Sequence, residues 1–192
     1  MKNIILLFTT ILLFQSCNGQ NEKQFYSKDF QWRINIPENF KTVSAAEWLK
    51  MQNKGTEAIE KTYNGKVENK ASTIFVFKND QLHYFEANYQ PFDSLFDGNY
   101  IQSFRNVNEV LYETFKEQMP GAKIDSLSTE TIIGNLTFQV FKTKIILPNQ
   151  IILNLEMYSR LFDKREFTVN IMYVDEKKGK LMLDAWKNSQ FN

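Results

Sequence analysis

The segment from Ala122 to Val174 constrains the fold more than any other part of this 192-residue chain. Apolar runs of strand length follow one another along it, separated only by short turn sequences such as Gly134-Asn135. Both residues of that turn tolerate positive φ, which suits a two-residue hairpin. Successive strands joined by such turns are typical of an antiparallel meander. We therefore predict four neighbouring strands, near 123–133, 136–146, 151–162 and 166–174.

The strands of this meander carry apolar side chains on both faces. In the strand at 166–174, Phe167 points to one face and Met172 to the other, because the side-chain period of a strand is two. A sheet that is apolar on both faces has to be covered on both sides. In a neighbouring strand, Val140-Phe141 interrupts the alternation, which predicts a bulge or a change of register there.

The rest of the chain adds three strands and about three helices. Ser44 and Glu47 form a capping box, so a helix is expected to start there, and Gly55 is expected to break or kink it. The fold class is therefore α+β: an antiparallel sheet of about six to seven strands with helices packed on its faces. The three further strands are predicted at 30–36, 72–77 and 82–90. A second helix ends at Pro120-Gly121 and carries Phe104, Val107, Leu111 and Phe115 on one stripe. A third helix covers 175–188, with Leu181, Met182, Ala185 and Trp186 in one arc.

The first sixteen residues have the pattern of a signal peptide. Lys2 is followed by an apolar run from Ile4 to Phe14. A run of about eleven residues is too short to cross a hydrocarbon core, which takes roughly 20 helical residues, but it suits a secretory signal. Ordinary cleavage after Ser16 would place the large Phe14 where a small residue is preferred, so another kind of processing is indicated.

The sequence Leu13-Phe14-Gln15-Ser16-Cys17 resembles a bacterial lipoprotein box, in which an apolar and then a small residue precede an invariant cysteine. The resemblance implies removal of residues 1–16 and lipidation of Cys17, and several acyl chains anchor a protein durably in a membrane. It also implies location in the bacterial cell envelope. Asn18, in place of aspartate, favours the outer over the inner membrane. The alternative is that Cys17 is an incidental residue beyond an ordinary signal peptide.

The composition limits what the mature chain binds. Without Lys2, 22 basic side chains balance 22 acidic ones, so no strong field attracts nucleic acid or anionic lipid. Cys17 is the one cysteine, and its lipidation leaves no thiol for a disulfide, a metal site or a nucleophile. The polar residues 17–24 are predicted to be a tether of up to about 25 Å, and residues 25–192 have the length of a single domain.

No constellation of residues indicates catalysis or cofactor binding. His83 is the one histidine, and Glu86, three positions on, points to the opposite face of the strand. We expect a strand histidine that is exposed or hydrogen-bonded. Carboxylate pairs such as Glu109 and Glu113 have ordinary helical spacing, and neither a glycine-rich phosphate loop nor an EF-hand loop occurs. We therefore predict no catalytic residue, no cofactor and no metal site, and a protein that is not an enzyme.

Two phrases of the sequence resemble the PsbP-like family. Residues 30–40 (FQWRINIPENF) are similar to its opening strand followed by Ile-Pro-x-x-(Trp/Phe), and residues 183–191 (LDAWKNSQF) are similar to its closing helix. The resemblance spans nearly all of 25–191. It implies an α/β/α sandwich and a role in binding or assisting partner proteins without a shared catalytic centre. It carries no partner-binding residue onto this chain. A cystatin-like or a lipid-binding half-barrel sheet is the competing architecture.

These observations favour a lipid-anchored, non-enzymatic envelope protein that binds a membrane through its anchor, binds or supports a protein partner, and does not bind nucleic acid. The alternative is a carrier of a small apolar or lipidic ligand in a cleft between sheet and helix; an unrecognised hydrolase comes third. A deep apolar cavity would favour the carrier, whereas an exposed aromatic patch on a body without cavities would favour the partner-binding domain. His83 against a buried carboxylate and an exposed hydroxyl would favour the hydrolase.

Overall fold

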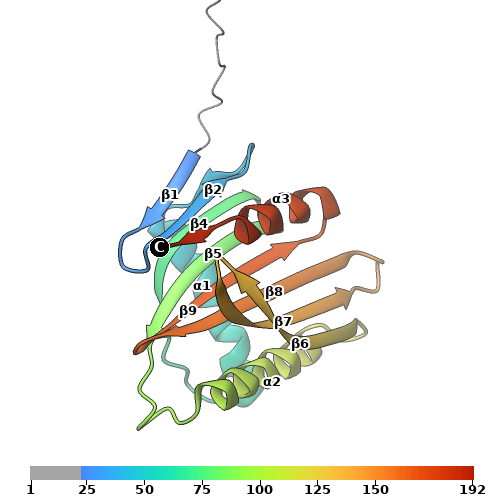
Figure 1. Ribbon diagram of the computed structural model, residues 1–192. Helices are drawn as coiled ribbons and strands as arrows, with labels where there is room; N and C mark the ends of the chain where they lie inside the picture. The colour runs from blue at the N-terminus through green and yellow to red at the C-terminus, as the bar shows by residue number, and fades with distance from the viewer. Residues whose placement is uncertain (1–22) are drawn as a thin grey trace, which may run out of the picture.

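A computed structural model describes residues 23–192 of the chain. Within them, ten strands form two antiparallel sheets, and three helices pack on the larger sheet (Figure 1). The strand orders are β3-β4-β5-β9-β8-β7-β6 and β1-β2-β10, which confirms the predicted α+β class. The elements are β1 (Lys23–Ser27), β2 (Trp32–Ile36), β3 (Lys41–Thr42), α1 (Ala45–Tyr63), β4 (Ser72–Asp80), β5 (His83–Pro91), α2 (Tyr100–Gln118), β6 (Lys123–Ile133), β7 (Leu136–Ile146), β8 (Ile152–Phe162), β9 (Arg165–Tyr173), α3 (Glu176–Lys187) and β10 (Gln190–Phe191).

The predicted meander is confirmed as strands β6 to β9. The β6–β7 hairpin turns at Gly134 (φ 53°) and Asn135 (φ 66°), as their tolerance of positive φ predicts. The predicted irregularity at Val140-Phe141 is wrong, because β7 pairs in continuous register through both residues with β6 and β8. Val140 and Phe141 are both buried. Since neighbouring residues point to opposite faces, the double apolar pair reflects a sheet covered on both sides.

The domain begins earlier than the sequence pattern predicts. Lys23 and Gln24, which their polarity assigns to the tether, are the first residues of β1 and pair with β2. Phe25 of the same strand stacks on Phe75, with 4.1 Å between the ring centroids. Contacts with distant segments therefore hold a strand that has little apolar pattern of its own. Cys17 and the predicted signal peptide lie outside the described residues.

The helix α1 is continuous, so the predicted break at Gly55 is wrong. It begins as predicted at Ser44, whose hydroxyl accepts a hydrogen bond from the Glu47 amide (3.3 Å). Asn99 and Asp175 cap the starts of α2 and α3 in the same way. Among the described residues, no helix combines the length and apolar character that a membrane span requires.

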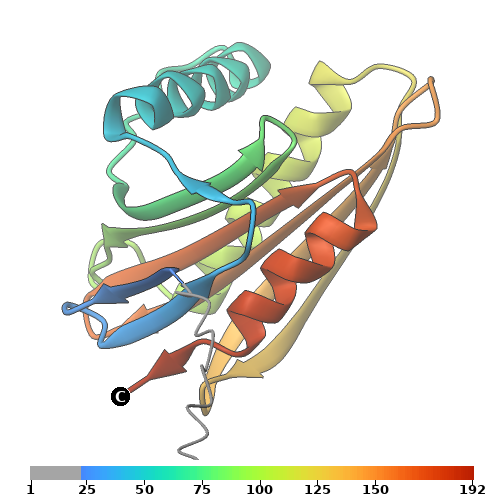
Figure 2. The ribbon, with the colours of Figure 1, turned by 90° about the horizontal axis from the view of Figure 1, so that it is seen from above.

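One face of the large sheet is covered by α3 together with the small sheet (Figure 2). Trp186 of α3 and Trp32 of β2 are fully buried there, with 6.1 Å between their ring centroids. Trp186 also meets Phe138 of β7 edge-on at 5.2 Å. Closely packed aromatic pairs of this kind add stabilisation beyond the area that they bury. This face is the dense core of the domain.

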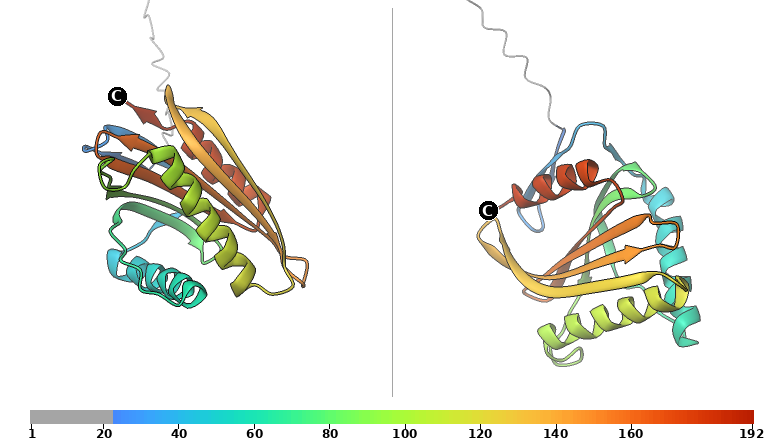
Figure 3. Two further views of the ribbon diagram at one scale, coloured as in Figure 1. Left: turned by 90° about the horizontal axis from the view of Figure 1, so that it is seen from below. Right: turned by 90° about the vertical axis from the view of Figure 1, so that its right-hand side faces the viewer.

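The opposite face of the sheet is covered by α1 and α2 (Figure 3). Trp48 of α1 is buried against Tyr84 of β5, with 5.1 Å between the ring centroids. Near the other end of α1, the Gln118 amide of α2 donates to the Thr62 hydroxyl (3.3 Å). The two helices are therefore fastened at separate points, and between these points they leave an apolar cleft over the sheet.

Candidate binding cleft

The cleft has a volume of about 430 Å³ and lies between α1, α2 and four strands of the sheet. Most of its lining side chains are apolar and only half-buried, although they face inward. Inward-facing apolar groups that remain accessible indicate room for an occupant. The residues that line it are Trp48, Met51, Gln52 and Gly55 of α1, Leu111 and Phe115 of α2, Met119, Tyr84 and Glu86 of β5, Phe141 and Thr143 of β7, Leu153, Leu155, Glu156 and Met157 of β8, and Asn170, Ile171 and Met172 of β9.

One stripe of α1 forms the roof. Trp48, Met51, Gln52 and Gly55 recur at intervals of three and four residues, which brings them to the same side of a helix. A Cβ atom built on Gly55 would meet no atom within 4 Å. The glycine therefore contributes open space to the cleft and is not needed for a turn.

Methionine supplies much of the apolar surface. Of the five methionines in residues 23–192, four line the cleft: Met51, Met119, Met157 and Met172. They come from α1, the end of α2, β8 and β9. Methionine is unbranched and polarisable, so it adapts its shape to different apolar partners. The lining is suited to a flexible apolar ligand.

Glu86 is a buried carboxylate that faces the cleft. Its Oε1 accepts from Trp48 Nε1 (2.8 Å) and Gln52 Nε2 (3.3 Å), and its Oε2 accepts from Asn170 Nδ2 (3.1 Å). Burial raises the pKa of Glu86 above its ordinary value, and these neutral donors oppose the rise. Burial, and then the charge of Glu86, also raises the pKa of the neighbouring Tyr84. Within the described chain, no ion pair reaches the Glu86 carboxylate.

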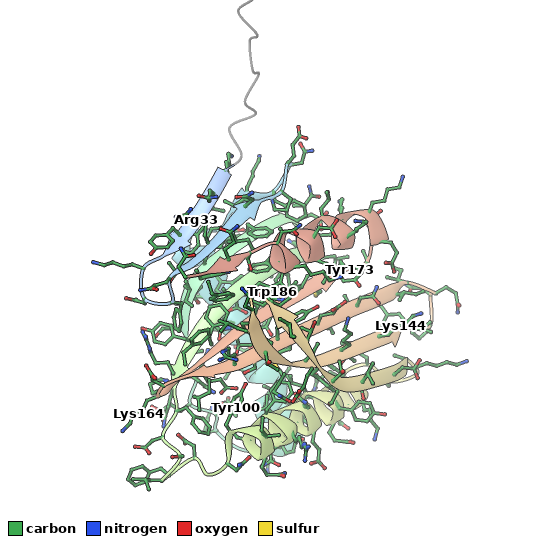
Figure 4. The ribbon with its side chains drawn as sticks, viewed as in Figure 1. Arg33, Tyr100, Lys144, Lys164, Tyr173 and Trp186 are labelled. Carbon is green, nitrogen blue, oxygen red and sulfur yellow. The ribbon has the colours of Figure 1, made fainter. Side chains whose placement is uncertain are left out.

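A second buried carboxylate, Glu166, lies on the same face of the sheet but outside the cleft. Its Oε1 accepts from the Ser159 hydroxyl (2.8 Å) and its Oε2 from Gln90 Nε2 (2.7 Å). The Tyr100 hydroxyl of α2 donates in turn to Ser159 Oγ (3.0 Å). Figure 4 shows Tyr100 and Trp186 on opposite sides of the sheet. This polar network fastens the start of α2, and it leaves Glu86 as the carboxylate that faces the cleft.

His83 has a structural role, which agrees with the expectation of a hydrogen-bonded strand histidine. Its Nδ1 lies 2.7 Å from Asp80 Oδ1, and its Nε2 accepts from the Asp175 amide (2.9 Å). Lys178 donates to Asp80 Oδ2 (2.8 Å). Burial acts to raise the pKa of Asp80, but the hydrogen bonds from Lys178 and His83 outweigh it and hold that pKa well below the usual range. The cluster ties the β4–β5 hairpin to the start of α3.

Three other carboxylates, on or beside the helices, have structural partners. Asp175 caps α3, Glu113 binds Lys116 on the helix surface, and Glu60 accepts from the Val67 amide (3.0 Å). In the described part of the chain, no group of three or more histidine, cysteine, aspartate or glutamate residues could hold a metal ion. The lining of the cleft includes no serine, cysteine, histidine or lysine. What it offers a ligand is apolar contact and a few polar groups, among them the acceptor Glu86.

The sequence prediction did not identify Glu86 or Gly55 as parts of a site. One local signal was present: the stripe Trp48, Met51, Gln52 and Gly55 places an indole, an amide and a gap on one helix face. Glu86 gave a weaker signal, as a carboxylate within a strand rich in aromatic residues. Its donors Trp48 and Asn170 are 38 and 84 positions away in the sequence, so their convergence was not predictable from local spacing.

No protein-family model and no curated protein matches this sequence. Among solved structures, the chain is similar to the solution structure of cyanobacterial PsbP (CyanoP) from Synechocystis sp. PCC 6803, with a TM-score of 0.57 and 7% sequence identity over 93% of this chain and 99% of that chain. A crystal structure from Bacteroides thetaiotaomicron VPI-5482 has a TM-score of 0.49 and 9% identity over 89% of this chain and 48% of that chain. The first likeness confirms a PsbP-like fold and, at this identity, shows the fold alone.

Proposed function

We propose that this chain is a non-enzymatic binding protein of the bacterial cell envelope, anchored through a lipid on Cys17, that holds a small apolar molecule in the cleft beneath α1 and α2. The observation that carries the proposal is the cleft itself. Its volume of about 430 Å³ lies within the range of roughly 300–1,000 Å³ that is usual for small-molecule sites. A cavity of this kind favours the carrier over a domain that acts only through its surface.

The composition of the lining supports binding in preference to chemistry. Leu111, Phe115 and Leu155 offer apolar surface, the lining includes no serine, cysteine, histidine or lysine, and methionines allow the walls to adjust. Glu86 adds one fixed acceptor that orients a ligand. This combination of apolar walls and few polar groups is common in carrier sites.

The anchor and the tether fit this role. If Cys17 carries acyl chains, residues 17–22 reach at most about 20 Å from the membrane to the start of β1. The domain then stays close to the bilayer, which is a source of apolar molecules. The balanced charge of the mature chain adds no electrostatic attraction to anionic lipid, so the acyl chains supply the attachment.

The cleft is tested by titration with N-phenyl-1-naphthylamine, whose fluorescence rises in apolar sites. We expect saturable binding with a 1:1 ratio. Gly55→Leu places a branched side chain in the open space and is expected to weaken binding by about tenfold or more, about 1.4 kcal/mol. Gly55→Ala adds one methyl group and is the matched control, with binding within about threefold of the original. Absence of saturable binding, or equal binding by both variants, would contradict the assignment.

The anchor is tested separately with Cys17→Ala. Radioactive palmitate is expected to label the unmodified chain, which sediments with membranes, whereas Cys17→Ala takes up no label. Because Cys17 is the one cysteine, no other thiol can take its place. Label on the variant, or an unmodified chain with a free thiol in the soluble fraction, would show that the lipoprotein assignment is wrong.

A second candidate function, contact with a protein partner, is favoured by the loop between β5 and α2. Leu95 and Phe96 are 87% and 88% exposed, whereas Phe92 beside them is buried. Asp93 accepts from the Leu95 and Phe96 amides (3.0 and 2.9 Å), which shapes the loop. The loop lies at the end of the domain opposite the start of β1 (Figures 1 and 3). A domain tethered at β1 would therefore present these two side chains away from the membrane.

The loop is tested by crosslinking in intact cells. A partner with an apolar pocket is expected to crosslink to the unmodified chain and to lose the crosslink in the Leu95→Ser/Phe96→Ser variant, with N-phenyl-1-naphthylamine binding unchanged. An identical crosslinking pattern in both chains would contradict this second function.

A further inference from the structure

We infer that the ligand of the cleft carries a cationic nitrogen, such as a primary ammonium group, at the end of an apolar chain, and that this nitrogen pairs with Glu86. The inference rests on the proposed function, because it assigns a chemical class to the occupant of the same cleft. It starts from an imbalance of charge in the cleft lining.

The residues that line the cleft include two carboxylates, Glu86 and Glu156, and no lysine, arginine or histidine. Glu86 is 7% exposed. Its described donors are all neutral side chains: Trp48, Gln52, Asn88 and Asn170. Glu156 also borders the cleft, but its carboxylate has its own cation, with Lys142 Nζ at 2.8 Å. Glu86 therefore faces the cleft as a buried carboxylate without a described counter-ion, an arrangement that favours a positively charged partner.

The hydrogen bonds show where the nitrogen would approach. Gln52 Nε2 lies 3.3 Å from Glu86 Oε1 and also 3.3 Å from the Thr73 hydroxyl. It can therefore give up the carboxylate and still donate to Thr73. Trp48 and Asn170 hold the carboxylate in place at shorter distances. Displacement of one long, shared hydrogen bond by a charge-assisted one is favourable, so Oε1 on the Gln52 side is the acceptor.

If Glu86 served only to fasten α1 to the sheet, its negative charge would not be needed. A neutral glutamine would also accept from Trp48 without bringing a charge into an apolar site. Fatty acids and other anionic amphiphiles are disfavoured, because their carboxylate would lie beside that of Glu86. A neutral alcohol would fit the apolar walls but would leave the charge uncompensated. An amphiphile with an ammonium group contacts the apolar walls with its chain and pairs with the Glu86 carboxylate through its head group.

The test is displacement of N-phenyl-1-naphthylamine from the purified protein by ligands that share one chain and differ in the head group: dodecylamine, dodecanol, dodecanoate and N-acetyl-dodecylamine, each below the concentration at which it forms micelles. We expect dodecylamine to displace the dye at a concentration about tenfold lower than dodecanol and N-acetyl-dodecylamine, and dodecanoate to be the weakest. Equal displacement by the amine and the alcohol would overturn the inference while leaving the proposed function standing. Absence of saturable dye binding would overturn both.

The variant Glu86→Gln tests whether the preference for dodecylamine depends on Glu86. It is expected to reduce the advantage of dodecylamine over dodecanol, measured on the same variant, to about twofold or less. Glu166→Gln removes a buried carboxylate on the same face outside the cleft and is the matched control, with the full preference for the amine. A preference that survives Glu86→Gln would overturn the inference. The head-group series on the unmodified chain decides the question even if Glu86→Gln does not fold.

Discussion

Replacement of Gly55 and Gly179 by alanine is expected to change the stability of the domain in opposite directions. Both glycines lie within helices, α1 and α3. Alanine is favoured over glycine in a helix interior by about 1 kcal/mol. At Gly55 an added Cβ meets no atom within 4 Å, so nothing opposes this gain. Gly55→Ala is therefore expected to raise the free energy of unfolding by about 1 kcal/mol.

At Gly179 the same methyl group has no room. A Cβ there would lie 2.3 Å from Cδ2 of Tyr173 and 2.6 Å from its Cγ. The ring is held in the core, and its hydroxyl donates to Glu156 Oε1 (3.3 Å). Overpacking of a core costs about 1–3 kcal/mol, and loss of a hydrogen bond to a charged group adds about 1.5–3 kcal/mol. After the helix gain of about 1 kcal/mol is subtracted, Gly179→Ala is expected to lower the free energy of unfolding by about 1.5–5 kcal/mol.

The assay is urea denaturation followed by far-ultraviolet circular dichroism, with the two variants measured beside the unmodified chain. A shift in the midpoint with an unchanged slope identifies a change in stability. A loss of stability in Gly55→Ala would show that the space beside α1 is filled, and with it the cleft. A gain in Gly179→Ala would show that α3 does not pack on Tyr173 as closely as described.

Three further predictions concern the cap of α1 and two carboxylates. Ser44→Ala removes the acceptor for the Glu47 amide and is expected to lower the free energy of unfolding by about 1 kcal/mol in the same urea assay; an unchanged midpoint would contradict the cap. The pKa of Glu86 is raised in the folded state, so the folded chain holds this proton more tightly than the unfolded chain does. The free energy of unfolding therefore falls as the pH rises from 4.5, the ordinary pKa of a glutamate, through the folded-state pKa. Glu86→Gln is expected to flatten this fall in a plot of melting temperature against pH above pH 4.5. An equal slope in both chains would contradict the burial of the Glu86 charge. The pKa of Asp80 is lowered in the folded state. The stabilisation that the ionised Asp80 gives the fold is therefore present above pH 3.8, the ordinary pKa of an aspartate, and is lost as the pH falls through the folded-state pKa. Asp80→Asn is expected to show less loss of stability on acidification, and acid unfolding identical to that of the unmodified chain would exclude the pairing with Lys178.

The meander was predictable because its signals are local. Alternating apolar residues define β6 to β9, and Gly134-Asn135 supplies the two positive φ angles of a hairpin turn. The capping box at Ser44 is likewise contained within four residues. Elements of this kind carry their pattern in consecutive residues and do not depend on distant partners.

The parts that differ from the prediction depend on distant contacts. The start of β1 at Lys23 and the short strand β10 form by pairing with β2, and their own sequences show little pattern. The predicted stripes of α2 and α3 included Val107 and Leu181, both of which are exposed, whereas the buried faces include Asn108 and Gly179. A small or polar residue that is buried at a close contact between elements is not recognised by a search for apolar periodicity. The site was not predicted for the same reason, because the open space at Gly55 forms part of a cleft only through the strands that lie beneath it.

The most direct test of the cleft uses the methionine methyl groups. Met51, Met119, Met157 and Met172 line the cleft, whereas Met182 of α3 is buried in the core on the opposite face of the sheet. With methionine labelled at its ¹³C methyl group and assigned by single Met→Leu variants, titration of the purified protein with dodecylamine in detergent-free buffer is expected to shift the signals of the first four and leave that of Met182 in place. Shifts confined to Met182, or no shift at saturating ligand, would contradict the account of the cleft as a binding site.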